Sequence, residues 1–218
     1  MTGIDFRPCR RGLYDGKMPV IGAGQEDASL LLGAKSVHIA VAAAVDPPTL
    51  SRIVRANADD AEICRLAMRC VHHETLALVP LGDMQMGQQL ADAMILAMVR
   101  NLSDPIIAEY GAFHLGTLAF NGLIGSDEMF ECIGAVTQAM DTHRETERVA
   151  AWCCRALTHI SMGGADIKSF GAQLRVKNAQ DIFPESSDVQ RWGGMALALD
   201  GRVSASRGSR RPRPATSQ

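Results

Sequence analysis

Apolar and polar positions follow one another along most of this chain with the spacing of amphipathic helices. From Gln25 onward, apolar residues recur at intervals of three and four, and no run shows the alternation typical of a β-strand. We therefore predict an all-α fold. The predicted helices lie near residues 26–44, 47–57, 59–73, 84–101, 104–121, 127–141, 144–161, 165–178 and 187–199.

Acidic or hydroxyl side chains stand where several of these helices begin. A side-chain oxygen at this position accepts a hydrogen bond from a free amide of the first turn, and proline is favoured at the first helical position. These signals mark the predicted starts of three helices. They are the residue pairs Asp46-Pro47, Asp104-Pro105 and Ser126-Asp127.

One pattern of large and small residues recurs at intervals near 40 residues. Because its positions lie on one stripe of a helix, each copy presents a large residue and then a small one that a neighbouring helix can approach closely. One further helix lies between copies, so the repeating unit is a helix pair. The copies are Val149-x-x-Trp152-x-x-x-Ala156-Leu157, Val189-x-x-Trp192-x-x-x-Ala196-Leu197, and the looser Tyr110-x-x-Phe113-x-x-x-Thr117-Leu118 and Ile63-x-x-Leu66-x-x-x-Cys70-Val71.

This repeat resembles those of the armadillo/HEAT superfamily over about residues 59–200. The second helix of a pair in that superfamily often carries a bulky apolar residue followed by Ala-Leu, as in VAAWCCRALTHIS and VQRWGGMALALD. The resemblance implies an α-solenoid of stacked helix pairs that acts as a non-enzymatic scaffold for protein–protein interaction, with no cofactor. The chain departs from the family in its irregular first interval, and the asparagine ladder that holds extended peptides in some armadillo proteins is not evident.

By analogy with the superfamily, we expect the partner-binding surface on the helices near 84–101, 127–141 and 165–178, taken as the second helices of their pairs. We also expect another subunit or further chain to cover the last repeat, because its final helix ends at Asp200 with no helix after it. The expected exposed partner-binding residues are Gln85, Gln88, Gln89, Asp92, Gln138, Lys168 and Gln173.

Composition divides the chain of 218 residues into three parts. Residues 25–200 form the predicted helical repeat domain, because an apolar content of 47% allows a sizeable core. Residues 1–24, rich in glycine and basic residues, are expected to form an extended arm. Residues 201–218 combine Ser, Gly, Pro and Arg without large apolar residues, which predicts a disordered basic tail. Both arms are expected to be flexible.

The basic tail supports an alternative function. Its arginines would attract phosphate groups or acidic surfaces, which makes the chain a candidate nucleic-acid- or phosphate-associated protein. The tail has no aromatic residue for stacking on bases, and a solubilising role is the simpler interpretation. The arginines concerned are Arg202, Arg207, Arg210, Arg211 and Arg213.

The second alternative is an enzyme that uses histidine and cysteine side chains. His72 and His73 are adjacent, but adjacent residues diverge on a helix and no other ligand pair has the spacing of a zinc site. Cys153 and Cys154 lie in an apolar helical stretch, where packing is the expected role. We therefore predict no metal site, no catalytic residue and no enzymatic activity.

Three further histidines, His114, His143 and His159, stand on different predicted helices. They could form a site only if tertiary packing brought them together. Gly163-Gly164 has no phosphate-binding fingerprint around it and is predicted to form a turn.

The chain is expected to be soluble and intracellular, with the cytoplasm as its predicted location. The first 20 residues lack the apolar segment of a secretory signal, and no apolar run approaches the 18 or so residues that span a bilayer. The six cysteines contain no C-x-x-C pair, which fits free thiols in a reducing compartment.

Overall fold

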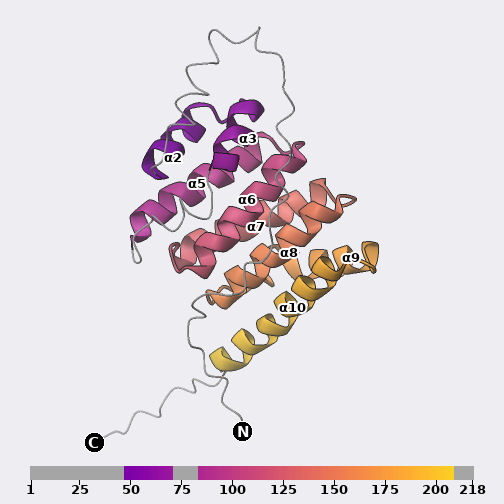
Figure 1. The fold of residues 1–218 in the computed structure, drawn as a ribbon. Helices are drawn as coiled ribbons and strands as arrows, with labels where there is room; N and C mark the ends of the chain where they lie inside the picture. The colour runs from indigo at the N-terminus through magenta and orange to yellow at the C-terminus, as the bar shows by residue number, and fades with distance from the viewer. Residues whose placement is uncertain (1–46, 71–82, 209–218) are drawn as a thin grey trace, which may run out of the picture. The chain divides into compact units, whose positions relative to one another are not determined.

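The chain is helical throughout the ranges that the structure describes. The computed structural model describes residues 47–70 and 83–208, with side chains at 47–69, 83–168 and 170–199, and no strand occurs in these ranges. The all-α prediction is confirmed for them, whereas the predicted helix 26–44 and the arm 1–24 lie outside them. The helices are α2 (Pro47–Ala56), α3 (Ala61–Cys70), α5 (Met84–Arg100), α6 (Pro105–Phe120), α7 (Ser126–Thr142), α8 (Glu147–Met162), α9 (Ala172–Ile182) and α10 (Ser187–Gly208) (Figure 1).

The helices fall into two sets by their contacts. Helices α3, α6, α8 and α10 contact one another in that order, and so do α2, α5, α7 and α9. Members of the two sets that follow each other in the chain also pack together, as α5 does with α6 and α7 with α8. Figure 1 shows the order running from α2 at the top to α10 at the bottom. The four copies of the sequence repeat begin on α3, α6, α8 and α10, and therefore all belong to one set.

Four turns of four residues each join α2 to α3, α5 to α6, α7 to α8 and α9 to α10. They cover residues 57–60, 101–104, 143–146 and 183–186. In each turn the amide of the fourth residue donates to the carbonyl of the first, over 2.9 to 3.2 Å. Asp104 then caps α6 by accepting hydrogen bonds from the amides of Ile106 and Ile107. The same local structure thus returns about every 40 residues.

Side chains in two of these turns bond to the turn before them. Asn101 Nδ2 donates to the carbonyl oxygen of Ala58 over 2.7 Å, across a sequence separation of 43 residues. His143 Nε2 donates to the carbonyl oxygen of Leu102 over 2.8 Å, across 41 residues. Each bond gives a hydrogen-bond donor to a backbone carbonyl of the turn, which has no intrahelical partner. Consecutive turns are therefore tied together in register.

Helices α6 and α8 also end alike. Gly122 and Gly164 adopt left-handed backbone conformations, with φ of 67° and 96°. The amides of the residues that follow them, Leu123 and Ala165, donate to carbonyls five positions back over 3.0 and 3.3 Å. This is the Schellman ending, in which glycine is favoured because a Cβ is strained at positive φ. The turn predicted at Gly163-Gly164 is confirmed.

Helices α6 and α8 approach each other closely at a glycine. A Cβ built on Gly116 would lie 2.9 Å from Cα of Ala156, so the absence of a side chain permits the contact. Ala156 is the small residue of the repeat pattern, and it is buried together with Val149 and Leu157. On the other side of α8, Thr158 Oγ1 donates to the carbonyl oxygen of Trp192 on α10 over 2.9 Å.

Two boundaries differ most from the predictions. Helix α9 begins at Ala172 and not near residue 165, because the ending of α8 is followed by a connection and by the 3₁₀ turn Ser169–Gly171. Helix α10 continues to Gly208, so the first part of the segment predicted to be disordered is helical. Residues 209–218 lie outside the described ranges.

Replacing Gly116 with alanine tests the close contact between α6 and α8. The added Cβ must displace the backbone of α8, and we expect the free energy of unfolding to fall by roughly 1–3 kcal/mol despite alanine's higher helix propensity. The matched control is Gly194→Ala on α10, since a Cβ there meets nothing within 4 Å. That variant should gain up to about 1 kcal/mol. Urea unfolding measures both, and equal changes in the two variants would refute the close approach.

Candidate protein-binding surface

The bulky position of the repeat forms a continuous row across three helices. Phe113 of α6, Trp152 of α8 and Trp192 of α10 occupy this position, and all three are partly exposed. The rings of Phe113 and Trp152 meet edge to face, with centroids 5.1 Å apart and planes at 75°. Aromatic pairs in this arrangement stabilise by about 0.5–1.5 kcal/mol beyond the area they bury.

Arg155 completes the row by linking the two tryptophans. Its guanidinium carbon lies 5.2 Å from the ring centroid of Trp152 and 4.9 Å from that of Trp192. A second guanidinium, that of Arg191, lies 5.2 Å from the centroid of Trp192. We call these five residues the aromatic–arginine row: Phe113, Trp152, Arg155, Arg191 and Trp192. Each cation–π contact contributes on the order of 0.5–1 kcal/mol at a partly exposed position.

The register of the repeat explains why these residues lie side by side. In each complete copy the first valine and the small alanine are buried, as Val149 and Ala156 show on α8. The bulky residue lies three positions after the valine, at the edge of the buried stripe. Since α6, α8 and α10 pack in order, the edge positions of successive copies come into contact.

An ion pair joins α6 and α8 near the start of α8. Arg148 Nε lies 2.7 Å from Glu109 Oε2 on α6. Burial raises the pKa of Glu109, and the positive charge of Arg148 opposes that shift. A second pair, between Arg65 Nε of α3 and Asp104 Oδ2, measures 2.8 Å. Each of these two arginines therefore has a carboxylate partner.

His159 lies behind the row, where it cannot easily be protonated. Its ring centroid is 4.9 Å from that of Phe120 and 5.7 Å from that of Trp192. Burial and the nearby charge of Arg155 lower the pKa of His159 to about 4, although a hydrogen bond with the backbone of Gly116 opposes the shift. The neutral imidazole thus acts as part of the packing between α6, α8 and α10.

The partner-binding residues predicted from the sequence lie on the other set of helices. Gln85, Gln88 and Gln138 are exposed, while Gln89 and Asp92 are partly covered. Two of these side chains bond to other residues of this chain. Gln88 donates a hydrogen bond to Glu128 of α7. Asp92 accepts one from Arg55 of α2 over 3.0 Å.

The other two predicted residues lie near α9. Lys168, before this helix, is exposed, and Gln173, within it, is partly exposed. The helices concerned precede the four-residue turns, so they come first within the pairs that those turns connect.

A small apolar patch adjoins Lys168 and Gln173 in the sequence. Phe170 and Leu174 are exposed by 57% and 62%, and Phe170 faces the side-chain position of Gly134 on α7 at 4.0 Å. Phe170 has a φ of 58°, a strained conformation for a non-glycine residue. Arg175 Nη1 donates to its carbonyl oxygen over 2.6 Å and so holds it in place.

Within the described ranges, the remaining residues proposed from the sequence do not form a reactive site. Burial raises the pKa of Cys64 to about 11 and those of Cys132 and Cys154 to about 12, and it raises the pKa of Cys153 well above its usual value. These thiols stay protonated at neutral pH and are poor nucleophiles. Within the described ranges, no three His, Cys, Asp or Glu side chains are grouped to hold a metal ion.

The three histidines have separate structural roles: His114 lies on α6, His143 in the turn after α7 and His159 on α8. His114 Nε2 is 2.9 Å from the carbonyl oxygen of Met68, and His143 bonds in the turn after α7. Residues 72–74, with the adjacent histidines, lie outside the described ranges. Arg202 and Arg207 belong to the helical backbone of α10, but their side chains, and all of Arg210, Arg211 and Arg213, lie outside what is described.

One hollow opens at the turn between α2 and α3. Its volume is about 700 Å³, and its lining includes Arg55, Asp59 and Arg100. Arg100 Nη1 reaches Asp59 Oδ1 at 3.5 Å, so the two opposite charges already interact across it. The lining combines both signs of charge and offers no grouped nucleophile and base.

Comparisons with known proteins gave no match to a protein family, to a curated protein or to a solved structure. None of the helices in the described part of the chain has the length and apolar character needed to cross a membrane.

The residue types of the aromatic–arginine row can be read from the sequence, but their contacts with one another cannot. The repeat pattern predicts packing roles for Phe113, Trp152 and Trp192, and it does not include Arg155 or Arg191. The available signal was the residue types themselves, because tryptophan and arginine are enriched among the residues that dominate binding energy at protein interfaces.

The low pKa of His159 makes stability depend on pH. An unfolded histidine titrates near 6.5, so the folded state binds the proton less readily, and the stabilisation present above pH 6.5 is lost as the pH falls toward 4. We expect a loss of about 2–3 kcal/mol at pH 4.5 relative to pH 7, beyond the loss shown by a His159→Gln variant. Urea unfolding of both proteins across this range measures the difference. Parallel pH profiles would show that His159 is protonated as easily in the folded state as in the unfolded one.

Proposed function

We propose that this chain is a non-enzymatic scaffold that binds a protein partner through the aromatic–arginine row. The observation that carries the proposal is the gathering of both tryptophans of the chain, a phenylalanine and two arginines on three consecutive helices. These residue types bury large areas, and they form the anchors of many protein interfaces. Their partial exposure leaves surface for a partner to cover.

We further propose that the helices form an α-solenoid of stacked pairs, similar to the armadillo/HEAT superfamily. The equal turns, the matching helix endings and the two parallel series of helix contacts support this architecture. Each pair would then contribute one helix to a continuous surface, which suits binding distributed over several repeats. The partner surface would lie on the second helices of the pairs, α6, α8 and α10, and not on α5, α7 and α9.

The ion pairs between repeats also support this arrangement. Arg65 with Asp104 and Arg148 with Glu109 connect neighbouring helices of the same set at equal sequence spacing. The covering of the last repeat by another subunit or further chain remains a prediction. Helix α10 offers Met195, which is 39% exposed, as an apolar contact for such a neighbour.

Site-specific photo-cross-linking in the cell of origin tests the proposed surface. A photoreactive residue placed at Tyr110 or Met195, beside the aromatic–arginine row, should form an adduct with a partner protein. Matched control positions are Gln138 on α7 and Leu174 on α9, which belong to the other set of helices. Adducts formed only at the control positions would contradict the proposal and favour the surface predicted from the sequence.

Substitution of the row gives the energetic counterpart of that experiment. Against the partner identified by cross-linking, Trp192→Ala should weaken binding by about 2 kcal/mol or more, roughly 30-fold, if Trp192 is an interface anchor. Leu174→Ala, the control, should change it by less than about 0.5 kcal/mol. Calorimetry measures both affinities, and circular dichroism shows whether each variant keeps its helices. Unchanged affinity for a folded Trp192→Ala protein would remove the row from the interface.

A further inference from the structure

We infer that a second copy of this chain covers the outer face of α10, through a two-fold contact between two antiparallel α10 helices. The inference rests on the stacking of helix pairs proposed above, and it does not depend on binding at the aromatic–arginine row. It identifies the neighbour expected at the last repeat as the chain itself. Its basis is a helix face that the two preceding repeats bury and that α10 leaves open.

Two positions of the repeat contact the next helix of the same set. At the first position, Gly116 of α6 lies against Ala156 of α8, and Arg155 of α8 packs on Trp192 of α10. At the second position, the hydroxyl group of Thr158 on α8 donates to the carbonyl oxygen of Trp192. Each of these contacts joins one unit to the next.

Helix α10 presents the same two positions without a helix to cover them. An offset of 40 residues from Arg155 and Thr158 leads to Met195 and Ala198. Met195 is 39% exposed, and Ala198 is exposed as well. Among the described helices, α10 is the last of its set, as Figure 1 shows. The repeat therefore gives α10 a face that packs against a helix in the two units before it.

The charges of α10 make this face complementary to itself. Asp188 and Arg202 stand seven residues before and seven residues after Met195. Residues seven positions apart return to nearly the same side of a helix. A two-fold axis at Met195 therefore places Asp188 of each copy beside Arg202 of the other, which gives two pairs of opposite charge.

The other charges on and beside α10 are compatible with this register. A residue a given number of positions after Met195 comes opposite the residue the same number before it in the other copy. No two like charges of α10 meet in this way. On α9, which packs beside α10, Lys177 and Asp181 add one charge of each sign. The opposing positions are Asp188 with Arg202, Arg191 with Leu199, Gln190 with Asp200, Glu185 with Ala205 and Phe183 with Arg207.

A head-to-tail stack, with α2 and α3 of another copy lying on α10, has less support. Of the large apolar side chains that are exposed in the described ranges, none belongs to α2 or α3. Such a stack also leaves an open face on each added copy and continues into a filament. Two-fold pairing uses the same face twice and closes, and Met195 of each copy then covers Met195 of the other.

Sedimentation velocity of the full-length chain measures the oligomeric state. We expect a dimer with a Kd below about 10 µM. Ala198→Glu should weaken the dimer at least about 30-fold, because each copy would bury an unpaired charge in the contact. The matched control is Gln138→Glu, which adds the same charge at an exposed position of α7 and should leave the dimer intact. Circular dichroism shows whether each variant keeps its helices.

Exchanging the two paired charges tests the register. Asp188→Arg alone and Arg202→Asp alone should each raise the Kd about 10-fold, because each brings like charges together twice. The double variant Asp188→Arg with Arg202→Asp restores the opposite charges, and its Kd should return to within about 3-fold of that of the unchanged chain.

A spin-labelled amino acid at Ser187 tests the orientation. In the antiparallel dimer the two labels should lie about 25 Å apart, because each is eight residues from the axis at 1.5 Å per residue. A parallel pair would bring them to about 10 Å, the spacing of neighbouring helices.

Each outcome decides a different point. A monomer at about 100 µM, or assemblies that keep growing with concentration, would overturn the two-fold contact. A label distance near 10 Å would overturn the antiparallel orientation, and a double charge variant that stays weak would overturn the axis at Met195. A photo-cross-link from Met195 to a second copy supports the dimer and says nothing of the proposed partner. A cross-link from Tyr110 on α6 to a different protein tests the proposed function separately.

Discussion

The contact between Gly116 and Ala156 brings α6 and α8 close enough for the rest of the surface to form. A side chain at Gly116 would meet the backbone of α8, and the small residue of the repeat lies directly opposite it. With the helices this close, Phe113 reaches Trp152 at 5.1 Å and Phe120 reaches His159 at 4.9 Å. The small residues Gly116 and Ala156 at the helix contact therefore allow the large side chains at its edge to pack against each other.

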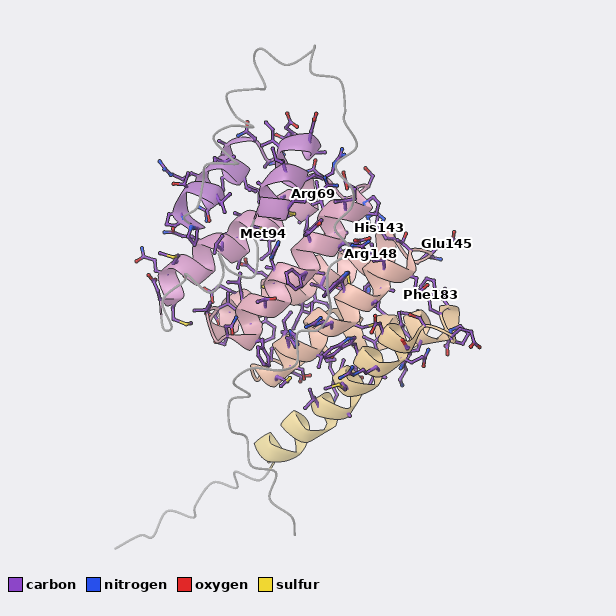
Figure 2. The ribbon with its side chains drawn as sticks, viewed as in Figure 1. Arg69, Met94, His143, Glu145, Arg148 and Phe183 are labelled. Carbon is purple, nitrogen blue, oxygen red and sulfur yellow. The ribbon has the colours of Figure 1, made fainter. Side chains whose placement is uncertain are left out.

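Polar bonds between equivalent positions then keep successive units in register. Asn101 and His143 each follow the last residue of a helix, and each donates to a carbonyl of the preceding turn. Figure 2 shows His143 and Glu145 in one such turn, with Phe183 in the next turn below them on the same side. Because these bonds join backbone to side chain at a fixed spacing, a shift of one unit against its neighbour would leave carbonyls unsatisfied. Shape and hydrogen bonding therefore favour the same stacking.

Much of the fold could be predicted from the sequence, but much less of the site. The apolar spacing and the cap at Asp104 predicted the helices of the described ranges, apart from the start of α9 and the extent of α10. Helix α7 begins at Ser126, but Gly125 occupies its N-cap position and no side chain caps it. The start of α9 depends on the left-handed backbone at Phe170 and Gly171, which no helix propensity reveals. The partner-binding residues predicted on α5 and α7 and around α9 stay a prediction, because exposure alone says little about binding. The contact of Arg155 with Trp192 joins two helices, and the two residues are 37 positions apart in the sequence. The pattern of a single helix does not show such a contact.

Distances between equivalent turns test most directly whether these helices form a solenoid of stacked pairs. Spin-labelled amino acids can be incorporated at the exposed third positions of the four turns, Asp59, Ser103, Glu145 and Glu185. With neighbouring helices about 10 Å apart, the distance from position 59 should rise by about that amount at each step, to roughly 25–30 Å at position 185. A distance from 59 to 185 no longer than that from 59 to 103 would show a closed bundle and contradict the account.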